Sequence, residues 1–106
     1  MNRYLTRNEV RSVFITALNR VANFNESDPE LEKNTFVNFH EFHIIVFLNA
    51  LKGIMNNRTF TYYGKTFCYN ITLNENMVSE WNTFKDCIDY IYENQLVMER
   101  LDNVNL

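Results

Sequence analysis

The chain has 106 residues, of which 46% are hydrophobic and 22% are charged, and its formal net charge at pH 7 is −3. This composition excludes a disordered chain, and the length predicts a single domain spanning residues 1–106. The acidic balance argues against a dedicated nucleic-acid-binding protein, which is usually basic. No apolar run is long enough to predict a transmembrane helix, and the N-terminus lacks an apolar leader, so we expect a cytoplasmic protein without membrane contact.

The first expected element is an amphipathic helix from residue 7 to about residue 21. Thr6 and Glu9 form the T-x-x-E pattern of a capping box, which marks a helix start. Apolar residues recur at the spacing of one buried helical stripe: Val10, Phe14, Ala17, Leu18 and Val21. Three arginines lie on or just before this helix: Arg3, Arg7 and Arg11. They are either a solvated helix face or a contact for an anion or a partner protein.

The most apolar stretch, residues 36–55, predicts a central helix. We expect Asn38 to cap it, with Glu41 completing a capping box. Polar residues occupy only a narrow face, so neighbouring elements should cover this helix on several sides. His40 and His43 fall in its apolar arc, and we expect both to face the core with hydrogen-bond partners in the following hairpin.

These histidines and the two cysteines are the only candidates for chemistry. The pattern His40-Glu41-Phe42-His43 places the histidines three residues apart, whereas the metalloprotease motif requires four. Cys68 and Cys87 are too few for a zinc framework of their own. The acidic connection at residues 24–35 lacks the central glycine of a calcium loop. We therefore predict no catalytic residue, metal or cofactor, and a hydrolase that uses a metal or a Cys–His pair ranks third among the functions considered.

Residues 58–73 predict a β-hairpin with Gly64-Lys65 as its two-residue loop, which places Tyr62 opposite Phe67. One face of this hairpin is then rich in aromatic residues: Phe60, Tyr62, Phe67, Tyr69 and Ile71. We expect this face to pack on the central helix, and the alternative is a platform for stacking nucleic-acid bases. Both strands have open edges, so pairing with a strand of another chain is a further alternative.

The last expected element is one long amphipathic helix over residues 75–101. Large, mostly apolar residues recur there at alternating intervals of four and three, as in a coiled-coil seam: Met77, Trp81, Phe84, Ile88, Ile91, Gln95 and Met98. The opposite face is acidic: Glu80, Asp86, Asp89, Glu93 and Glu99. The seam packs either within the molecule or, at its end, in a homodimer. Residues 102–106 are expected to fray.

The predicted fold is α+β in the order helix–helix–β-hairpin–helix, with a buried central helix covered by two amphipathic helices and a two-stranded antiparallel hairpin. The leading function is a small non-enzymatic protein that inhibits or regulates a partner by occupying its surface. Size and composition suit a phage or another mobile element that targets a host enzyme or defence complex. The acidic helix face is the first candidate contact, since it complements a basic groove. The alternative is a nucleic-acid-binding module that uses the three arginines and the hairpin.

Overall fold

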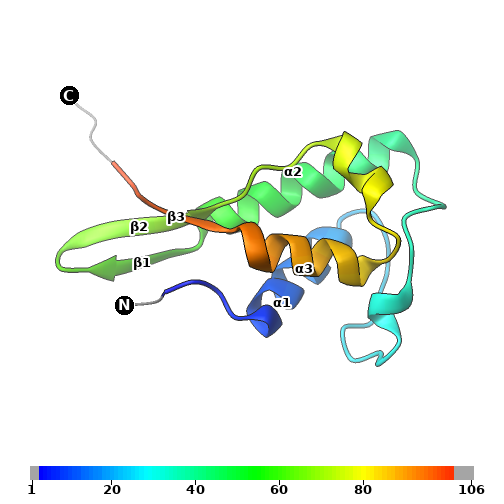
Figure 1. Ribbon diagram of the computed structural model, residues 1–106, viewed down its shortest axis with the longest axis horizontal. Helices are drawn as coiled ribbons and strands as arrows, with labels where there is room; N and C mark the ends of the chain where they lie inside the picture. Colours follow the sequence, from blue (N-terminus) through cyan, green and yellow to red (C-terminus); the bar gives the residue numbers. More distant parts are fainter. Residues whose placement is uncertain (1–2, 102–106) are drawn as a thin grey trace.

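The computed structural model describes residues 3–101 and confirms an α+β fold (Figure 1). The elements are helix α1 (Arg7–Leu18), 3₁₀ helix η1 (Leu31–Lys33), helix α2 (Glu41–Asn57), strands β1 (Thr59–Tyr62) and β2 (Lys65–Asn70), 3₁₀ helix η2 (Glu75–Glu80), helix α3 (Phe84–Asn94) and strand β3 (Leu96–Glu99). The strands form one antiparallel sheet in the order β1-β2-β3. This sheet projects from the helical body, and the molecule measures 45 × 28 × 22 Å (Figure 1).

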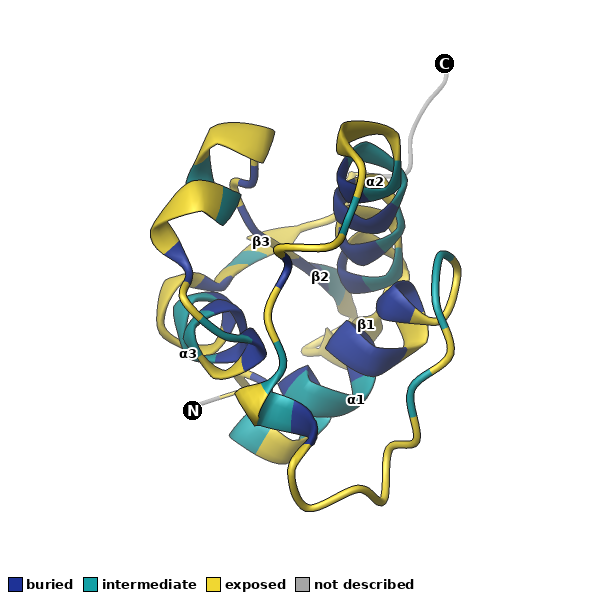
Figure 2. Cartoon of the chain, turned by 90° about the vertical axis from the view of Figure 1, so that its right-hand side faces the viewer, coloured by how far each residue is buried: buried dark blue, intermediate teal, exposed yellow. Residues whose placement is uncertain are grey.

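Helix α1 begins as predicted. The side chain of Thr6 accepts a hydrogen bond from the amide of Glu9, whose carboxylate accepts one from the amide of Thr6. The predicted stripe is buried apart from its last member, Val21, which is half-buried. The helix contacts both α2 and α3, and the helices turn their buried faces inward (Figure 2). Helix α1 therefore lies between the two other long helices in the packing.

Helix α2 starts two residues later than predicted, with His40 rather than Asn38 at its N-cap and without a capping box. Phe36 and Phe39 explain the later start of the helix. Both rings pack on Phe84, and the amide of Phe39 donates a hydrogen bond to the carbonyl of Phe36, which forms a turn before the helix. The expected burial around most of the helix is also wrong, since the side chain of Phe42 is 70% exposed.

The prediction of two core-facing histidines is wrong. His40 is exposed and His43 is half-buried, and their rings lie 5.5 Å apart, centroid to centroid. Both lie at the N-terminal end of α2, whereas the hairpin follows its C-terminal end (Figure 1). The length of the helix therefore separates these histidines from the hairpin groups expected to bind them.

The core is built around aromatic rings from different parts of the chain. Phe14 of α1 contacts Phe47 of α2 at 5.4 Å and Phe84 of α3 at 5.3 Å between ring centroids. Phe36, which precedes α2, lies 4.8 Å from Phe84. Edge-to-face and tilted pairs of this kind contribute about 0.5–1.5 kcal/mol each beyond the burial of their area. This cluster fixes how the three helices pack.

The hairpin turns one residue earlier than predicted, at Tyr63-Gly64. Both residues have positive φ, 52° and 75°, as a type I′ turn requires. Tyr62 consequently pairs with Lys65 rather than Phe67, and Phe60 pairs with Phe67. The shift is two residues along the partner strand, so every strand residue keeps its predicted face.

The single helix predicted over residues 75–101 is wrong, because η2, α3 and β3 occupy this stretch. The carboxylate of Asp86 accepts hydrogen bonds from the amides of Asn82 and Thr83, which starts a new helix at Phe84. After Gln95 the chain is extended, and β3 pairs antiparallel to β2. The coiled-coil seam is therefore absent, and β3 covers one hairpin edge that we expected to be open. The prediction for residues 102–106 lies outside the described residues.

Candidate functional site

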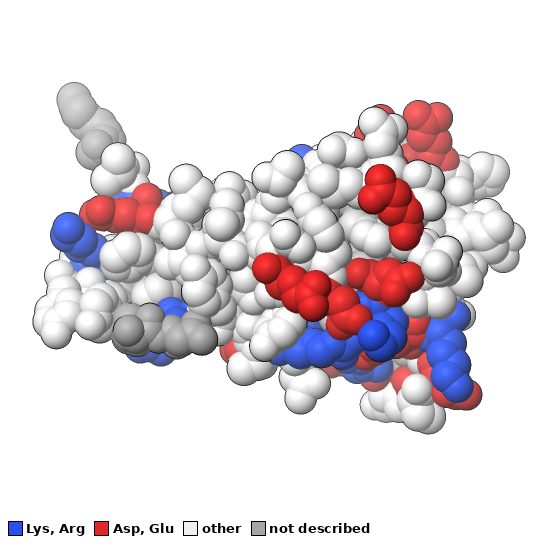
Figure 3. Space-filling model, in the orientation of Figure 1, with Lys and Arg blue, Asp and Glu red and all other residues white. Residues whose placement is uncertain are grey.

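The five predicted acidic residues lie on three elements instead of one helix. Glu80 ends η2, Glu99 ends β3, and the other three belong to α3. On the face shown in Figure 3, acidic side chains gather over α3 and η2. Asp86 is occupied as a helix cap, whereas Glu80, Glu93 and Glu99 are exposed. The acidic surface therefore exists, but as a discontinuous band.

Arg7 and Arg11, predicted as contact residues, form an ion cluster with other elements. The guanidinium of Arg7 bonds to Glu32 at 2.7 Å and to Asp89 at 2.8 Å, and that of Arg11 bonds to Glu32 at 2.9 Å. Lys85 adds a bond to Asp89 at 2.6 Å. The cluster joins α1 to η1 and α3, so these arginines and Asp89 have a structural role that accounts for their positions.

The ion cluster also changes the acidity of its members. The hydrogen bond from Arg7 lowers the pKa of Glu32 against the opposing effect of burial. Burial disfavours the ionised form of Asp89, but hydrogen bonds from Lys85 and Arg7 outweigh it and lower the pKa of this carboxyl. The lowered pKa values keep Glu32 and Asp89 charged at neutral pH, so neither is poised for proton transfer there.

Arg3, the remaining predicted arginine, belongs to the sheet end of the molecule. Its carbonyl accepts a hydrogen bond from the Tyr69 hydroxyl at 2.5 Å, and its guanidinium carbon lies 5.4 Å from the centroid of the Phe60 ring. A hollow of about 300 Å³ separates the N-terminal segment from the aromatic face of the sheet, and its lining is Arg3, Tyr4, Phe60, Tyr62, Phe67 and Val97. The N-terminal segment, rather than α2, therefore lies over the outer part of this face.

The tip of the hairpin exposes two tyrosines. Tyr63 is 85% exposed and Tyr62 is 38% exposed, with their rings 4.3 Å apart. Tyr63 has left-handed backbone geometry, which glycine and asparagine adopt more easily than a bulky residue. Strand alternation in the sequence placed Tyr63 inside a strand, and only the position of the turn reveals its exposure.

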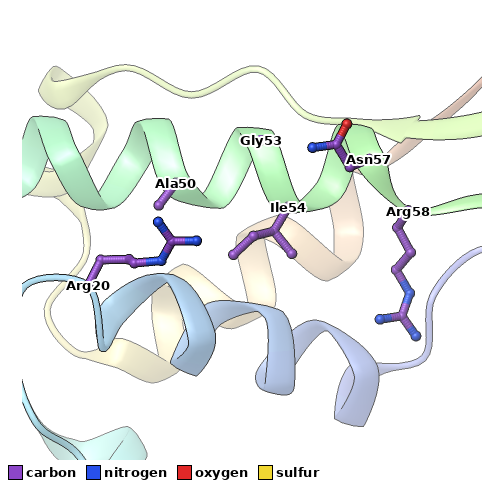
Figure 4. Close-up of a pocket in the computed structure, with 6 residues that line it drawn as sticks. All are labelled: Arg20, Ala50, Gly53, Ile54, Asn57 and Arg58. Carbon is purple, nitrogen blue, oxygen red and sulfur yellow. The ribbon is translucent and has the colours of Figure 1, made fainter.

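A groove between α1 and α2 is a further candidate that sequence reasoning missed. It has a volume of about 470 Å³ and is lined by Arg20, Ala50, Gly53, Ile54, Asn57 and Arg58 (Figure 4). Ile54 points into the groove between the two arginines (Figure 4). Its residues lie on α2 and just after the C-terminal ends of α1 and α2, so no local sequence pattern indicates it.

The residues considered for chemistry lie on separate elements. Cys68 is on β2, Cys87 is on α3, and both histidines are at the start of α2. Burial raises the pKa of the Cys87 thiol well above its ordinary value, which opposes formation of a nucleophilic thiolate. Among residues 3–101, no three or more His, Cys, Asp or Glu side chains gather in a group that could hold a metal ion. No described helix has the length and apolarity needed to cross a membrane.

Comparisons with known proteins give no further guide. The chain matches no family model, and no curated protein or solved structure is significantly similar to it.

Proposed function

We propose that this chain is a non-enzymatic protein that binds another protein, and that the tip of the β-hairpin makes the central contact. The observation that supports this proposal is Tyr63, a tyrosine 85% exposed in a left-handed conformation at the end of a projecting sheet. Backbone conformations that disfavour a side chain cost about 1–3 kcal/mol and cluster at functional sites. An Asn-Gly turn would serve the hairpin better, so the tyrosine is explained by contact with a partner.

Tyrosine is suited to that role. It presents a large, rigid ring with a polar end and is enriched among the residues that dominate protein interfaces. Tyr62 adds a second ring beside it. Tyr4 and Leu101 add exposed apolar area on the neighbouring N-terminal segment and after β3. The acidic residues Glu80, Glu93 and Glu99 would form the rim of a larger contact or meet a basic partner surface. An inhibitor from a phage or another mobile element fits the size and composition.

The alternative function is nucleic-acid binding through the same end of the molecule. The sheet, the residues next to its strands and the N-terminal segment carry more basic than acidic residues: Arg3, Arg58, Lys65 and Arg100 against Glu99. Ion pairs of Arg7 and Arg11 within the molecule make these two side chains poor phosphate contacts. This weakens the alternative, and a salt titration of binding to duplex and single-stranded DNA tests it. Absence of binding at low salt excludes it.

The Tyr63→Asn variant separates contact from folding. It should raise the midpoint of urea unfolding, because asparagine favours the left-handed conformation, and should abolish partner binding. The assay is affinity capture from lysate of the source cells or their host, followed by mass spectrometry, with wild type, Tyr63→Asn and the distant surface variant Val37→Ser as control. Wild type and Val37→Ser should retain the same protein and Tyr63→Asn should not. Retention by all three, or by none, contradicts the proposal.

A further inference from the structure

The groove between α1 and α2 has charged ends and an apolar floor. Arg20 follows α1 and Arg58 follows α2, and Gly53 and the side chains of Ala50 and Ile54 lie between them (Figure 4). The groove thus offers one cationic group at each end, with an aliphatic surface in the middle.

The two arginines differ in how far the protein neutralises them. Arg58 forms an ion pair with Glu9 at 3.1 Å, with about half of each side chain still exposed. The side chain of Arg20 forms no ion pair or hydrogen bond with the residues that the structure describes. The guanidinium of Arg20 extends toward Ala50 at the groove end (Figure 4). Positive charge therefore exceeds negative charge along this groove, in contrast to the acidic surface over α3.

Gly53 is the second feature of the groove. Glycine within a helix is destabilising relative to alanine. A Cβ atom at Gly53 would meet nothing within 4 Å, so packing inside the molecule does not require a glycine here. The residue also lines a second hollow on the other side of α2, together with Lys52 and Asn56. Its absent side chain leaves the backbone of α2 open to close approach from outside.

We infer that this groove binds an acidic segment of a partner protein, with two carboxylates that bind Arg20 and Arg58 and an apolar side chain between them that covers Gly53 and packs on Ile54. Carboxylates complement guanidinium groups in charge and in bidentate geometry. A second copy of this chain seated symmetrically on α2 would place cationic groups against each other, which disfavours that occupant. This contact is separate from the hairpin tip, so either can fail without the other.

Selection from a displayed library of random 12-residue peptides tests the inference. Peptides are selected on the wild type and counter-selected on Gly53→Leu, a variant whose side chain fills the groove. The survivors should be enriched in pairs of Asp or Glu that flank an apolar residue. The best peptide, labelled with a fluorophore, should bind the wild type more tightly in 20 mM than in 150 mM NaCl, because its contacts are ionic.

Three further variants assign the affinity to the groove. Arg20→Gln should weaken binding of the peptide about tenfold, as expected when one charged partner of a hydrogen bond is lost. Lys52→Gln removes a cation from the same helix, where its amine lies 3.4 Å from the Leu73 carbonyl, and should leave affinity within about twofold. Gly53→Ala should raise the midpoint of urea unfolding, which shows that substitution there is tolerated by the fold.

Any of the following outcomes overturns the inference. Selected peptides without acidic enrichment, or equal binding to Gly53→Leu and wild type, show that the groove is not a site for acidic segments. An equal loss of peptide affinity in Lys52→Gln and Arg20→Gln shows that the peptide is held only by general charge attraction to the protein. A concentration-dependent dimer in sedimentation that Gly53→Leu abolishes shows that a second copy is the occupant.

Discussion

Replacement of Gln95 by methionine should detach the N-terminal segment from α3. The two side chains have similar volumes, so the substitution changes the hydrogen bonds and not the packing volume. Gln95 is the one buried polar or charged residue among residues 3–101, with 6% of its surface exposed. Its Oε1 atom accepts a hydrogen bond from the amide of Leu5 at 2.8 Å. Its Nε2 atom donates to the carbonyls of Leu5 and Tyr92, both at 3.0 Å. Methionine makes none of these bonds.

The expected loss follows from the number of bonds and their burial. Each hydrogen bond contributes about 1 kcal/mol net, and a buried backbone group left without a partner costs about 1–3 kcal/mol. Burial of the methionine side chain offsets part of this loss. We expect Gln95→Met to lower the free energy of unfolding by about 2–4 kcal/mol and the melting temperature by about 10–25 °C. Native proteins have only about 5–15 kcal/mol in total, so this loss is large.

Urea unfolding followed by fluorescence measures the effect. Trp81 is the single tryptophan and is 9% exposed, so its emission reports loss of the core. Gln95→Glu keeps an acceptor for the Leu5 amide but sets an oxygen against two carbonyls, and should lose at least as much stability at pH 7. Asn94→Ala is the control, because that amide is exposed and bonds only within its own helix, to the Tyr90 carbonyl. A loss below about 0.5 kcal/mol for Gln95→Met would refute the reasoning.

Two other predictions concern the ion cluster and the buried thiol. The pKa of Glu32 is lower in the folded than in the unfolded chain, so its stabilising contribution is complete above the unfolded value and is lost as pH falls through the folded value. Glu32→Gln should lower the free energy of unfolding by about 1 kcal/mol at pH 7. Between pH 5 and 3 the variant should lose less stability than the wild type, as measured by urea unfolding at each pH. Equal losses in the two proteins would contradict the role of this carboxylate. Cys87 is fully buried and its pKa is raised, so a thiol reagent at pH 8 should modify it only as fast as the protein unfolds. Mass spectrometry of tryptic peptides measures that rate, and modification at the rate of a free thiol would show that the site is open.

The sequence predicted best those features whose signals lie within one short stretch of the chain. The capping box at Thr6 and Glu9 and the apolar stripe predicted the start and the buried face of α1, although the helix ends at Leu18 rather than near residue 21. The faces of the hairpin followed from strand alternation alone, even though the turn was placed one residue too late. The narrow polar face predicted for the central helix is also present, since Asn49 and Asn56 of α2 are exposed.

The C-terminal third shows why periodicity can mislead. Trp81, Phe84, Ile88 and Ile91 are buried as the seam predicted, yet Trp81 follows η2 and only the other three belong to α3. Thr83 followed by Asp86 is close to a capping box and was the available signal for the break. No comparable signal preceded β3, because its strand conformation depends on the partner edge that β2 provides.

The candidate sites depended on distant parts of the chain. Arg7 bonds to Asp89, 82 positions away, and to Glu32, 25 positions away. The sequence therefore showed that the three residues are charged, but not that they form one cluster. The exposure of Tyr63 depended on the exact turn, and the groove at Gly53 depended on how α1 packs on α2. The sequence therefore showed which residues are charged, but not which of them pair within the molecule.

The hydrogen bonds between Leu5 and Gln95 also tie the two end segments of the described chain to each other. They join residues 90 positions apart, and closing a flexible loop of that length costs about 4 kcal/mol beyond a constant. The ion pair of Arg7 with Asp89 closes almost the same loop, so the bonds between Leu5 and Gln95 add little to this cost once α1 and α3 have packed. We expect the two end segments to open before the helical core does. Proteases and hydrogen exchange should detect the opening of these segments first, while the helical core is still intact.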